Sequence, residues 1–358
     1  MKNSSDIGQI RVQIDQIDQQ VLNLLNERME LVKEIGNLKR TTNAAIYRPE
    51  RERAILERLE SINSGRLSPQ AIEAIFLEIF AVSRNIELPE KVAYLGPEGS
   101  FTHQAAEARF GAMSDYIPLK SIQSVFESVV TQRVRFGIVP IENNQEGIVS
   151  ESIKLMSENN VRIVAEVPMP IHLAFASLED RLTNIKKVYS KDIAFRQCSR
   201  FLEDYLGEEV EYIPVESTST AAKLASSEKQ SAAVCAHIAA KMYDLPVLFE
   251  NIEDSSDNYT RFLIISHDYR NQRSGEDKTT ILAQLSAEPG SLAMFLQDFN
   301  EEHINLTKIE SYPAKKGKSF HYQFLVEFDG HIDDPKITRI MEKNSSIVKW
   351  LGSYPKLC

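Results

Sequence analysis

Several features that mark specialised classes of protein are missing from this sequence of 358 residues. Its three cysteines, Cys198, Cys235 and Cys358, lie far apart and offer neither a disulfide framework nor a CxxC pair. No run of about 18 apolar residues is long enough to cross a membrane, and the opening MKNSSDIGQI lacks the apolar core of a signal peptide. These absences predict a protein of a reducing, cytoplasmic compartment with no membrane partner.

Basic residues are outnumbered by acidic ones. The chain has 41 Lys and Arg against 51 Asp and Glu, a net charge of −10, which disfavours nucleic acid as the main partner. Its seven histidines show neither HxxxH nor HExxH spacing, so no metal site is expected. What remains, 42% apolar and 26% charged residues, is an ordinary globular composition, and the length predicts two or three domains.

Residues 1–90 are predicted to form an all-α module. Apolar residues from Ile10 to Leu38 recur at alternating steps of four and three, except that one position of this seam carries Arg28. A second helix is expected to start at Pro49, a favoured first-turn residue, and a third after the capping residue Ser68.

Charged and polar residues occupy inward positions of these predicted helices. Lys39 follows Arg28 by 11 residues, hence about 20° round the helix and about 16 Å along it, so both side chains can reach one small anion. Arg11 lies about 25 Å from Arg28 on the same helix and could join them only from another subunit. The other two helices add Arg51, Glu52, Ser83 and Glu87. A seam charge can also simply fix the register of a coiled coil, but together these residues predict a polar pocket that binds a small anion.

Across residues 1–88 this spacing resembles that of the all-helical chorismate mutases. The resemblance implies that Arg28 and Arg11 of a partner chain hold the two carboxylates of chorismate, while Lys39 binds its ether oxygen. It further implies that Glu52 takes the hydroxyl and that the site includes Arg48, Arg51, Ser83 and Glu87. Arg48, where some members carry Asp, can serve through its backbone N–H, and Arg51 is equally plausible in a structural ion pair. Such a pericyclic rearrangement needs a compact conformer and stabilisation of charge on the ether oxygen, and no cofactor.

Glu87 stands where some members of that family carry Gln. The ether oxygen needs a hydrogen-bond donor, and a carboxyl group donates only when protonated, a state that an inward, apolar position favours and Lys39 opposes. We therefore expect mutase activity to fall as the pH rises through neutrality, and Glu87→Gln to remove this loss. The alternative is an ordinary Glu at a helix end.

From residue 91 to residue 267, short β-rich runs alternate with helical stretches, which predicts an α/β domain. We expect two lobes around a cleft, as in periplasmic binding proteins, with strands crossing between them near Asn143 and Tyr212. A Gly-Pro-Glu-Gly turn before a helix start suits an anion but matches neither GxGxxG nor the phosphate loop. The polar residues at this turn and at strand or helix ends are Ser100, Thr102, Glu142, Asn143, Gln197, Asn258, Thr260 and Arg261.

These fragments, in this order, resemble prephenate dehydratase over residues 91–267. The resemblance makes Thr260 the residue that protonates or hydrogen-bonds the departing hydroxyl, while decarboxylation supplies the electrons and no base is needed. It leaves Arg261 either on a substrate carboxylate or in a structural ion pair. The other polar residues above are implied as its network and as substrate-binding groups. Cys198 as a nucleophile is the alternative, but no covalent intermediate is required.

After a charged linker, 268–278, residues 279–358 are predicted as strand–helix–strand–strand–helix–strand, an α+β ferredoxin-like plait. From topology alone, dimerisation and ligand sensing are equally plausible roles. Two segments resemble the amino-acid-binding segments of ACT domains in prephenate dehydratases, in which L-phenylalanine binds between paired plaits and inhibits. The residues concerned are Pro289, Gly290, Ser291, Leu292, Glu310 and Ser311. Members often have Arg in place of Tyr312 and Ala in place of Ser291.

Together the resemblances imply a cytoplasmic bifunctional enzyme that turns chorismate into prephenate and prephenate into phenylpyruvate. Its expected ligands are these substrates and L-phenylalanine, and it is expected to be a homodimer or higher oligomer. One alternative is a non-enzymatic binder whose helices only dimerise, although such a protein would favour Leu at position 28. Another is a dehydratase whose helical module serves only assembly.

Overall fold

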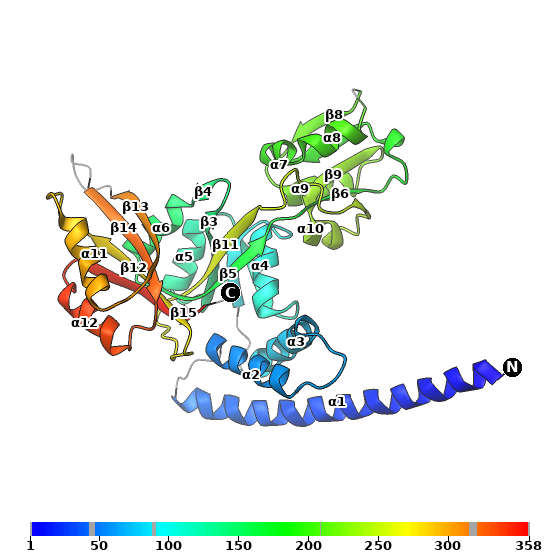
Figure 1. The fold of residues 1–358 in the computed structure, drawn as a ribbon. Helices are drawn as coiled ribbons and strands as arrows, with labels where there is room; N and C mark the ends of the chain where they lie inside the picture. Colours follow the sequence, from blue (N-terminus) through cyan, green and yellow to red (C-terminus); the bar gives the residue numbers. More distant parts are fainter. Residues whose placement is uncertain (1, 43–46, 88–90, 208, 315–320, 357–358) are drawn as a thin grey trace.

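The computed structural model of the chain describes residues 2–42, 47–87, 91–207, 209–314 and 321–356. A helical module comes first, two α/β lobes follow, and a sheet with two helices ends the chain (Figure 1). Of the helices within these ranges, none is long and apolar enough to span a membrane.

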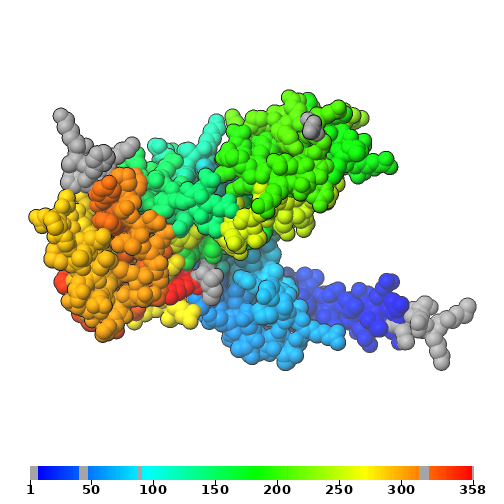
Figure 2. Space-filling model, turned by 45° about the horizontal axis from the view of Figure 1, so that its top comes forward, coloured from blue at the N-terminus to red at the C-terminus, as the bar shows by residue number. Residues whose placement is uncertain are grey.

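The helical module consists of α1 (Lys2–Thr42), α2 (Pro49–Ile62) and α3 (Pro69–Glu87), which confirms the all-α prediction. Pro49 stands in the first turn of α2, and the Ser68 hydroxyl accepts a hydrogen bond from Ala71 N–H at the start of α3. The N-terminal half of α1 extends away from the rest of the molecule (Figures 1 and 2). Its apolar seam is therefore about half exposed, from Ile10 at 55% to Leu24 at 64%.

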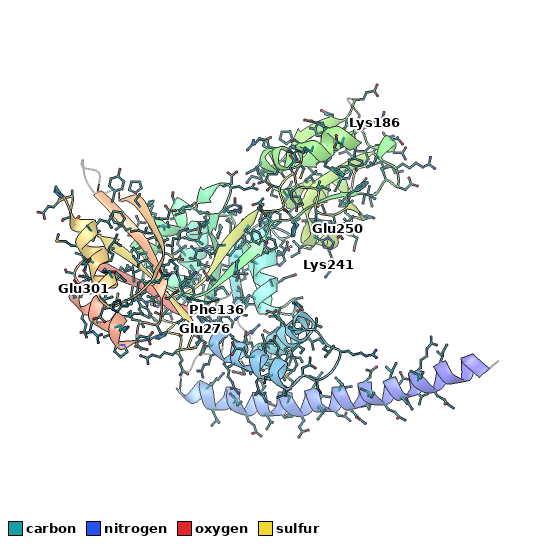
Figure 3. The ribbon with its side chains drawn as sticks, viewed as in Figure 1. Phe136, Lys186, Lys241, Glu250, Glu276 and Glu301 are labelled. Carbon is teal, nitrogen blue, oxygen red and sulfur yellow. The ribbon has the colours of Figure 1, made fainter. Side chains whose placement is uncertain are left out.

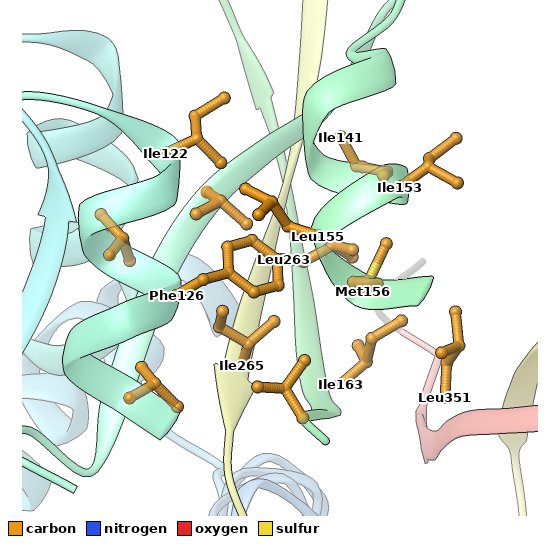
Figure 4. Close-up of a cluster of buried hydrophobic side chains, with 14 of the residues drawn as sticks. Ile122, Phe126, Ile141, Ile153, Leu155, Met156, Ile163, Leu263, Ile265 and Leu351 are labelled. Atoms are coloured by element: carbon orange, nitrogen blue, oxygen red, sulfur yellow. The ribbon is translucent and has the colours of Figure 1, made fainter. Parts of the chain in front are cut away.

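The first α/β lobe is built on a six-stranded sheet in the order β2-β1-β3-β11-β5, with β4 paired to β3. Strand β11 runs antiparallel to both β3 and β5, whereas β1, β2 and β3 are parallel. The core on one side of this sheet gathers Phe126, Ile141 and Leu263 (Figure 4). The elements are β1 (Lys91–Leu95), α4 (Phe101–Phe110), β2 (Asp115–Leu119), α5 (Ile122–Val130), β3 (Phe136–Asn143), β4 (Gly147–Ile148), α6 (Ser150–Glu158), β5 (Arg162–Pro170) and β11 (Tyr259–Ser266).

The second lobe is a five-stranded sheet in the order β10-β6-β9-β7-β8. Its elements are β6 (Leu173–Ser177), η1 (Leu182–Asn184), β7 (Lys187–Ser190), α7 (Asp192–Gln197), α8 (Ser199–Tyr205), β8 (Glu211–Pro214), α9 (Thr218–Ala225), β9 (Ser231–Ala236), α10 (His237–Met242) and β10 (Val247–Phe249). The two-lobed α/β prediction is confirmed.

The predicted crossing points between the lobes are wrong. The chain crosses between β5 and β6 and returns between β10 and β11. Asn143 instead ends β3 within the first lobe, and Tyr212 lies in β8 at the edge of the second. Alternating strands and helices indicate how many strands exist, but not which sheet each one joins.

The C-terminal part has the predicted plait topology, a four-stranded antiparallel sheet in the order β13-β14-β12-β15. Its elements are β12 (Asp277–Gln284), α11 (Ser291–Glu301), β13 (Leu306–Ala314), β14 (His321–Asp329), α12 (Pro335–Lys343) and β15 (Val348–Pro355). One face carries the helices, and the other packs on the first lobe, where Leu351 joins the core that holds Ile163 (Figure 4). The contact is so close that a side chain at Gly352 would collide with the backbone of Ile163.

Several described contacts attach the helical module to the rest of the chain, two of them in or just before α2. Tyr47 is fully buried in the first lobe's core, where it contacts Phe136 edge-on and its carbonyl accepts a hydrogen bond from Tyr269. Arg53 of α2 donates to Glu276 over 2.6 Å. Glu276, labelled in Figure 3, lies just before β12. The helical module is therefore not a free appendage.

Candidate active sites

A cavity of about 310 Å³ lies between the three N-terminal helices. This volume is at the small end of the range for small-molecule sites, about 300–1,000 Å³. It is lined by seven of the eight polar residues that the sequence predicted for it, namely Arg28, Lys39, Arg48, Arg51, Glu52, Ser83 and Glu87. Arg11 is the exception, because it is exposed on the extended half of α1.

Two contacts order the cations of this cavity. Arg28 Nη1 donates to Ser83 Oγ over 2.5 Å, and Lys39 Nζ donates to Glu87 Oε2 over 2.7 Å. Burial lowers the pKa of the Arg28 guanidinium, and the nearby Glu87 partly offsets this. Helices α1 and α3 approach closely here, since a Cβ on Gly36 would lie only 3.0 Å from Glu87 Cα. Glu87 is therefore an ion-pair partner of Lys39, the neighbouring cation that the sequence analysis expected beside it.

Glu52 is held by residues that the sequence analysis missed. Arg84 lines the cavity and pairs with Glu52 Oε1, while Arg109 of α4 lies 3.8 Å from Glu52 Oε2. Arg84 directly follows Ser83, but it lies about 100° further round the helix, outside the predicted stripe. Arg109 belongs to the first α/β lobe, so no spacing within the helices could have indicated it.

In the α/β part, Asn143 and Thr260 stand opposite each other on β3 and β11. The Asn143 amide nitrogen donates to Thr260 Oγ1 and to Asn258 Oδ1, each over 2.8 Å. Its amide oxygen accepts the backbone N–H groups of Gln145 and Glu146, both at 2.9 Å. These four bonds fix the orientation of the Asn143 amide. Three of the predicted residues, Asn143, Asn258 and Thr260, are therefore brought together.

The turn before α4 touches both lobes. Ser100 caps α4 by accepting from His103 N–H, and Thr102 is buried in the first turn. Gly99 has φ +76°, and a Cβ there would lie 2.9 Å from Ser219 Oγ in the second lobe. Only glycine suits this backbone and this close approach.

A second cavity, about 240 Å³, lies where the lobes meet. Gln197 ends α7 and donates to Gln145 over 3.1 Å, so it bridges the lobes, and Asn258 lines the same cavity. Arg196, beside Gln197, also lines it and was not singled out from the sequence. Cys198 is fully buried, and burial raises the pKa of its thiol well above the usual range, which disfavours the alternative of a nucleophile.

Comparison with known proteins assigns both parts. The family model for chorismate mutase type II matches residues 10–88, and that for prephenate dehydratase matches residues 92–270. The bifunctional chorismate mutase/prephenate dehydratase of Aquifex aeolicus is 41% identical over 98% of both chains, and that of Pseudomonas aeruginosa is 37% identical over 99% of both. The chain belongs to the bifunctional chorismate mutase/prephenate dehydratase family. It has the two activities of that family.

Solved structures agree for the dehydratase part. A prephenate dehydratase from Arthrobacter aurescens in complex with L-Phe superposes with a TM-score of 0.67 at 30% identity, covering 74% of this chain and 90% of that one. The enzyme from Staphylococcus aureus superposes with a TM-score of 0.64 at 26% identity, over 74% of this chain and 99% of that one. Among the described residues, no group of three or more His, Cys, Asp or Glu could hold a metal ion.

Beneath the dehydratase residues lies what we call the interdomain charge cluster. Glu142 and Arg261 stand opposite each other on β3 and β11, one position from Asn143 and Thr260, so their side chains point to the other face of the sheet. There they meet the plait. The cluster consists of Glu142, Glu166 and Arg261 from the first lobe and Lys278, Lys308 and Glu327 from the plait.

Arg261 therefore takes the second of the two roles that the sequence left open, the structural ion pair. It contacts Glu327 at 2.8 Å and Glu142 and Glu166 at 3.1 Å. Burial alone would raise the pKa of Glu142, but Lys308 and Arg261 outweigh it and hold that pKa below its usual value. Glu142, which was predicted to bind substrate, pairs instead with Lys308 of the plait, because strand alternation turns its side chain to the same face of the sheet as Arg261.

The plait residues predicted to bind a regulator lie at two places. Gly290, with φ +86°, precedes α11, and the Ser291 hydroxyl donates to Ser286 O over 2.7 Å. Pro289 and Leu292 flank them in sequence. Glu310 and Ser311 lie on the edge strand β13. Tyr312, next to Ser311, packs against the core shared with the dehydratase lobe.

Proposed function

We propose that the cavity of the mutase module binds chorismate and rearranges it to prephenate. The observation that carries this is the convergence of Arg28, Lys39, Glu52 and Glu87 in one small cavity between three helices. Arg28, oriented by Ser83, would hold one carboxylate, and Lys39 would stabilise the charge that builds on the ether oxygen. Glu52 would accept the substrate's hydroxyl, while Arg51 adds positive potential around the dianion. The Arg48 guanidinium pairs with Glu50 at 2.9 Å, so Arg48 would serve through its backbone N–H.

A second copy of the chain is proposed to complete this site. Arg11 lies on the half of α1 that extends away from its own module, about 25 Å from Arg28 by helix geometry. The same half exposes a regular apolar seam, which a second α1 could cover. A homodimer would then bury the seams and bring Arg11 of each copy to the other's cavity.

The dehydratase site is proposed to lie at Thr260. As the ring carboxylate of prephenate leaves as CO2, its bonding electrons aromatise the ring and expel the 4-hydroxyl, which takes up a proton and departs as water. Because Asn143 already donates to Thr260 Oγ1, the threonine's own hydrogen is left to donate to that hydroxyl. Asn258 and Gln197 line the adjacent cavity, and Ser100 and Thr102 lie at the start of α4; these residues are proposed to position the substrate.

The test is to inactivate each site separately. Thr260→Ala should abolish phenylpyruvate formation from prephenate and leave chorismate consumption at the wild-type rate. Lys39→Met should do the reverse, because the residues lie in different modules. Loss of both activities, or of neither, in either variant would contradict this assignment.

We further propose that residues 279–358, after the linker at 268–278, form an ACT domain through which L-phenylalanine inhibits the dehydratase. The relative from Arthrobacter aurescens, solved in complex with L-Phe, supports this. The ligand would contact Pro289 to Leu292 together with Glu310 and Ser311. Inhibition requires a state with higher affinity for the ligand and lower activity. L-Phenylalanine should raise the melting temperature and lower the dehydratase rate, whereas D-phenylalanine should do neither; no effect of the L-isomer would refute this proposal.

A further inference from the structure

Glu52 depends on both modules of the enzyme for its position. It is 7% exposed, and its Oε1 pairs with Arg84 of the mutase module. Within the described chain, Oε2 has no hydrogen-bond partner, and it lies 3.8 Å from Arg109 of the dehydratase module. One carboxylate oxygen is thus tied within its own module, and the other faces a cation from the next one.

Arg109 is itself rigidly placed. It lies in the last turn of α4, and its Nε donates to the hydroxyl of Tyr47 over 2.6 Å. Its guanidinium also lies 5.6 Å from the centre of the Tyr47 ring. Burial alone would lower the pKa of Arg109, but Tyr47 and Glu52 outweigh it and the net shift is upward.

Arg84 makes the reciprocal connection. While Nη1 contacts Glu52, its Nη2 donates to the carbonyl of Phe110, the last residue of α4, over 2.8 Å. The guanidinium lies 5.5 Å from the ring centres of both Tyr47 and Phe110. Each of the two arginines around Glu52 is therefore anchored partly outside the mutase helices.

From this arrangement we infer that Arg109 is a positioning residue of the mutase site, supplied by the dehydratase module. It acts through Glu52, and the inference rests on the proposed role of Glu52 as acceptor of the substrate's hydroxyl. A buried carboxylate paired on one side only can turn toward its single partner, whereas two cations fix both oxygens. Without Arg109, Oε2 should leave the orientation in which it receives the hydroxyl.

The test measures mutase kinetics in the full-length enzyme. A hydrogen bond to a hydroxyl that does not react stabilises bound substrate and transition state alike, so its loss raises KM and leaves kcat unchanged. Arg109→Gln should raise KM for chorismate about tenfold, within the range for coupled neighbours. In a Glu52→Ala background the same change should add almost nothing. Tyr47→Phe, which removes only the group that anchors Arg109, should raise KM by a smaller factor.

The matched control is Asn85→Ala, which removes another contact between α3 and the chain after α4, a 2.8 Å bond to Met113 O, without touching Glu52. It should leave KM unchanged. Turnover of added prephenate, measured on every variant, shows that the chain is folded. An equal rise in KM with and without Glu52, or a rise no larger than that of Asn85→Ala, would overturn the inference. If Glu52→Ala itself leaves KM unchanged, the proposed role of Glu52 is wrong as well.

Discussion

The interdomain charge cluster allows a quantitative test of how the plait is held on the dehydratase lobe. The cluster contains three carboxylates and three cations, and the side chains of Glu166 and Glu327 are only 4% exposed. Arg261→Met would leave three carboxylates facing two ammonium groups. Breaking a buried pair by removing one partner costs about 3–5 kcal/mol. For a cooperative unit of about 150–250 residues that corresponds to a fall in melting temperature of about 6–20 °C.

Thermal unfolding of the full-length chain measures this, with Arg339→Met as the control. Arg339 pairs with Glu302 on the outer surface of the plait, where solvent screens the interaction, so its loss should leave the melting temperature nearly unchanged. Adding Glu327→Gln to Arg261→Met restores the balance of charge and should recover part of the lost stability. The reasoning is refuted if Arg261→Met is no more harmful than Arg339→Met, or if the two cluster substitutions simply add.

Three further predictions concern the mutase module and its contact with the end of α4. Because an amide can donate to the ether oxygen and a carboxylate paired with Lys39 cannot, Glu87→Gln should raise mutase kcat/KM at neutral pH; an unchanged or lower value would contradict it. Mixed and refolded Arg11→Ala and Lys39→Met chains, each inactive alone, should regain up to about a quarter of the activity if Arg11 acts across a dimer, and no recovery would place it elsewhere. Gly111→Ala should cost about 1–3 kcal/mol in urea unfolding, since Gly111 has φ +80° and its Cβ would lie 2.6 Å from Ala81 Cβ; an unchanged midpoint would refute this.

The sequence was informative wherever periodicity or a short motif places residues within one element or one module. Steps of three and four located the helices, and they brought Arg28, Lys39, Ser83 and Glu87 to one cavity. The order of strands and helices in the last 80 residues predicted the plait. Both depend on local geometry, which the sequence carries directly.

Contacts between modules were beyond such reasoning, because they depend on how separate units dock. Arg109 lies 57 residues after Glu52, and no periodicity links an α/β helix to a helical bundle. Arg261 is different, since strand alternation could have resolved it: if Thr260 faces the cleft, its neighbour faces the other side of the sheet. The crossing points of the two lobes needed the hydrogen-bond partners of each strand, which alternation does not specify.

The burial of Tyr47 has a consequence for how the protein is made. A chain leaves the ribosome N-terminus first, and domains generally fold in that order. In this protein Tyr47, just before α2, packs among Phe110, Phe136 and Tyr269. These three residues are synthesised between about 60 and about 220 residues later. The first three helices can form early, but their final arrangement waits for the lobe that follows. The enzyme that acts first in the reaction sequence is thus completed only after most of the second has been translated.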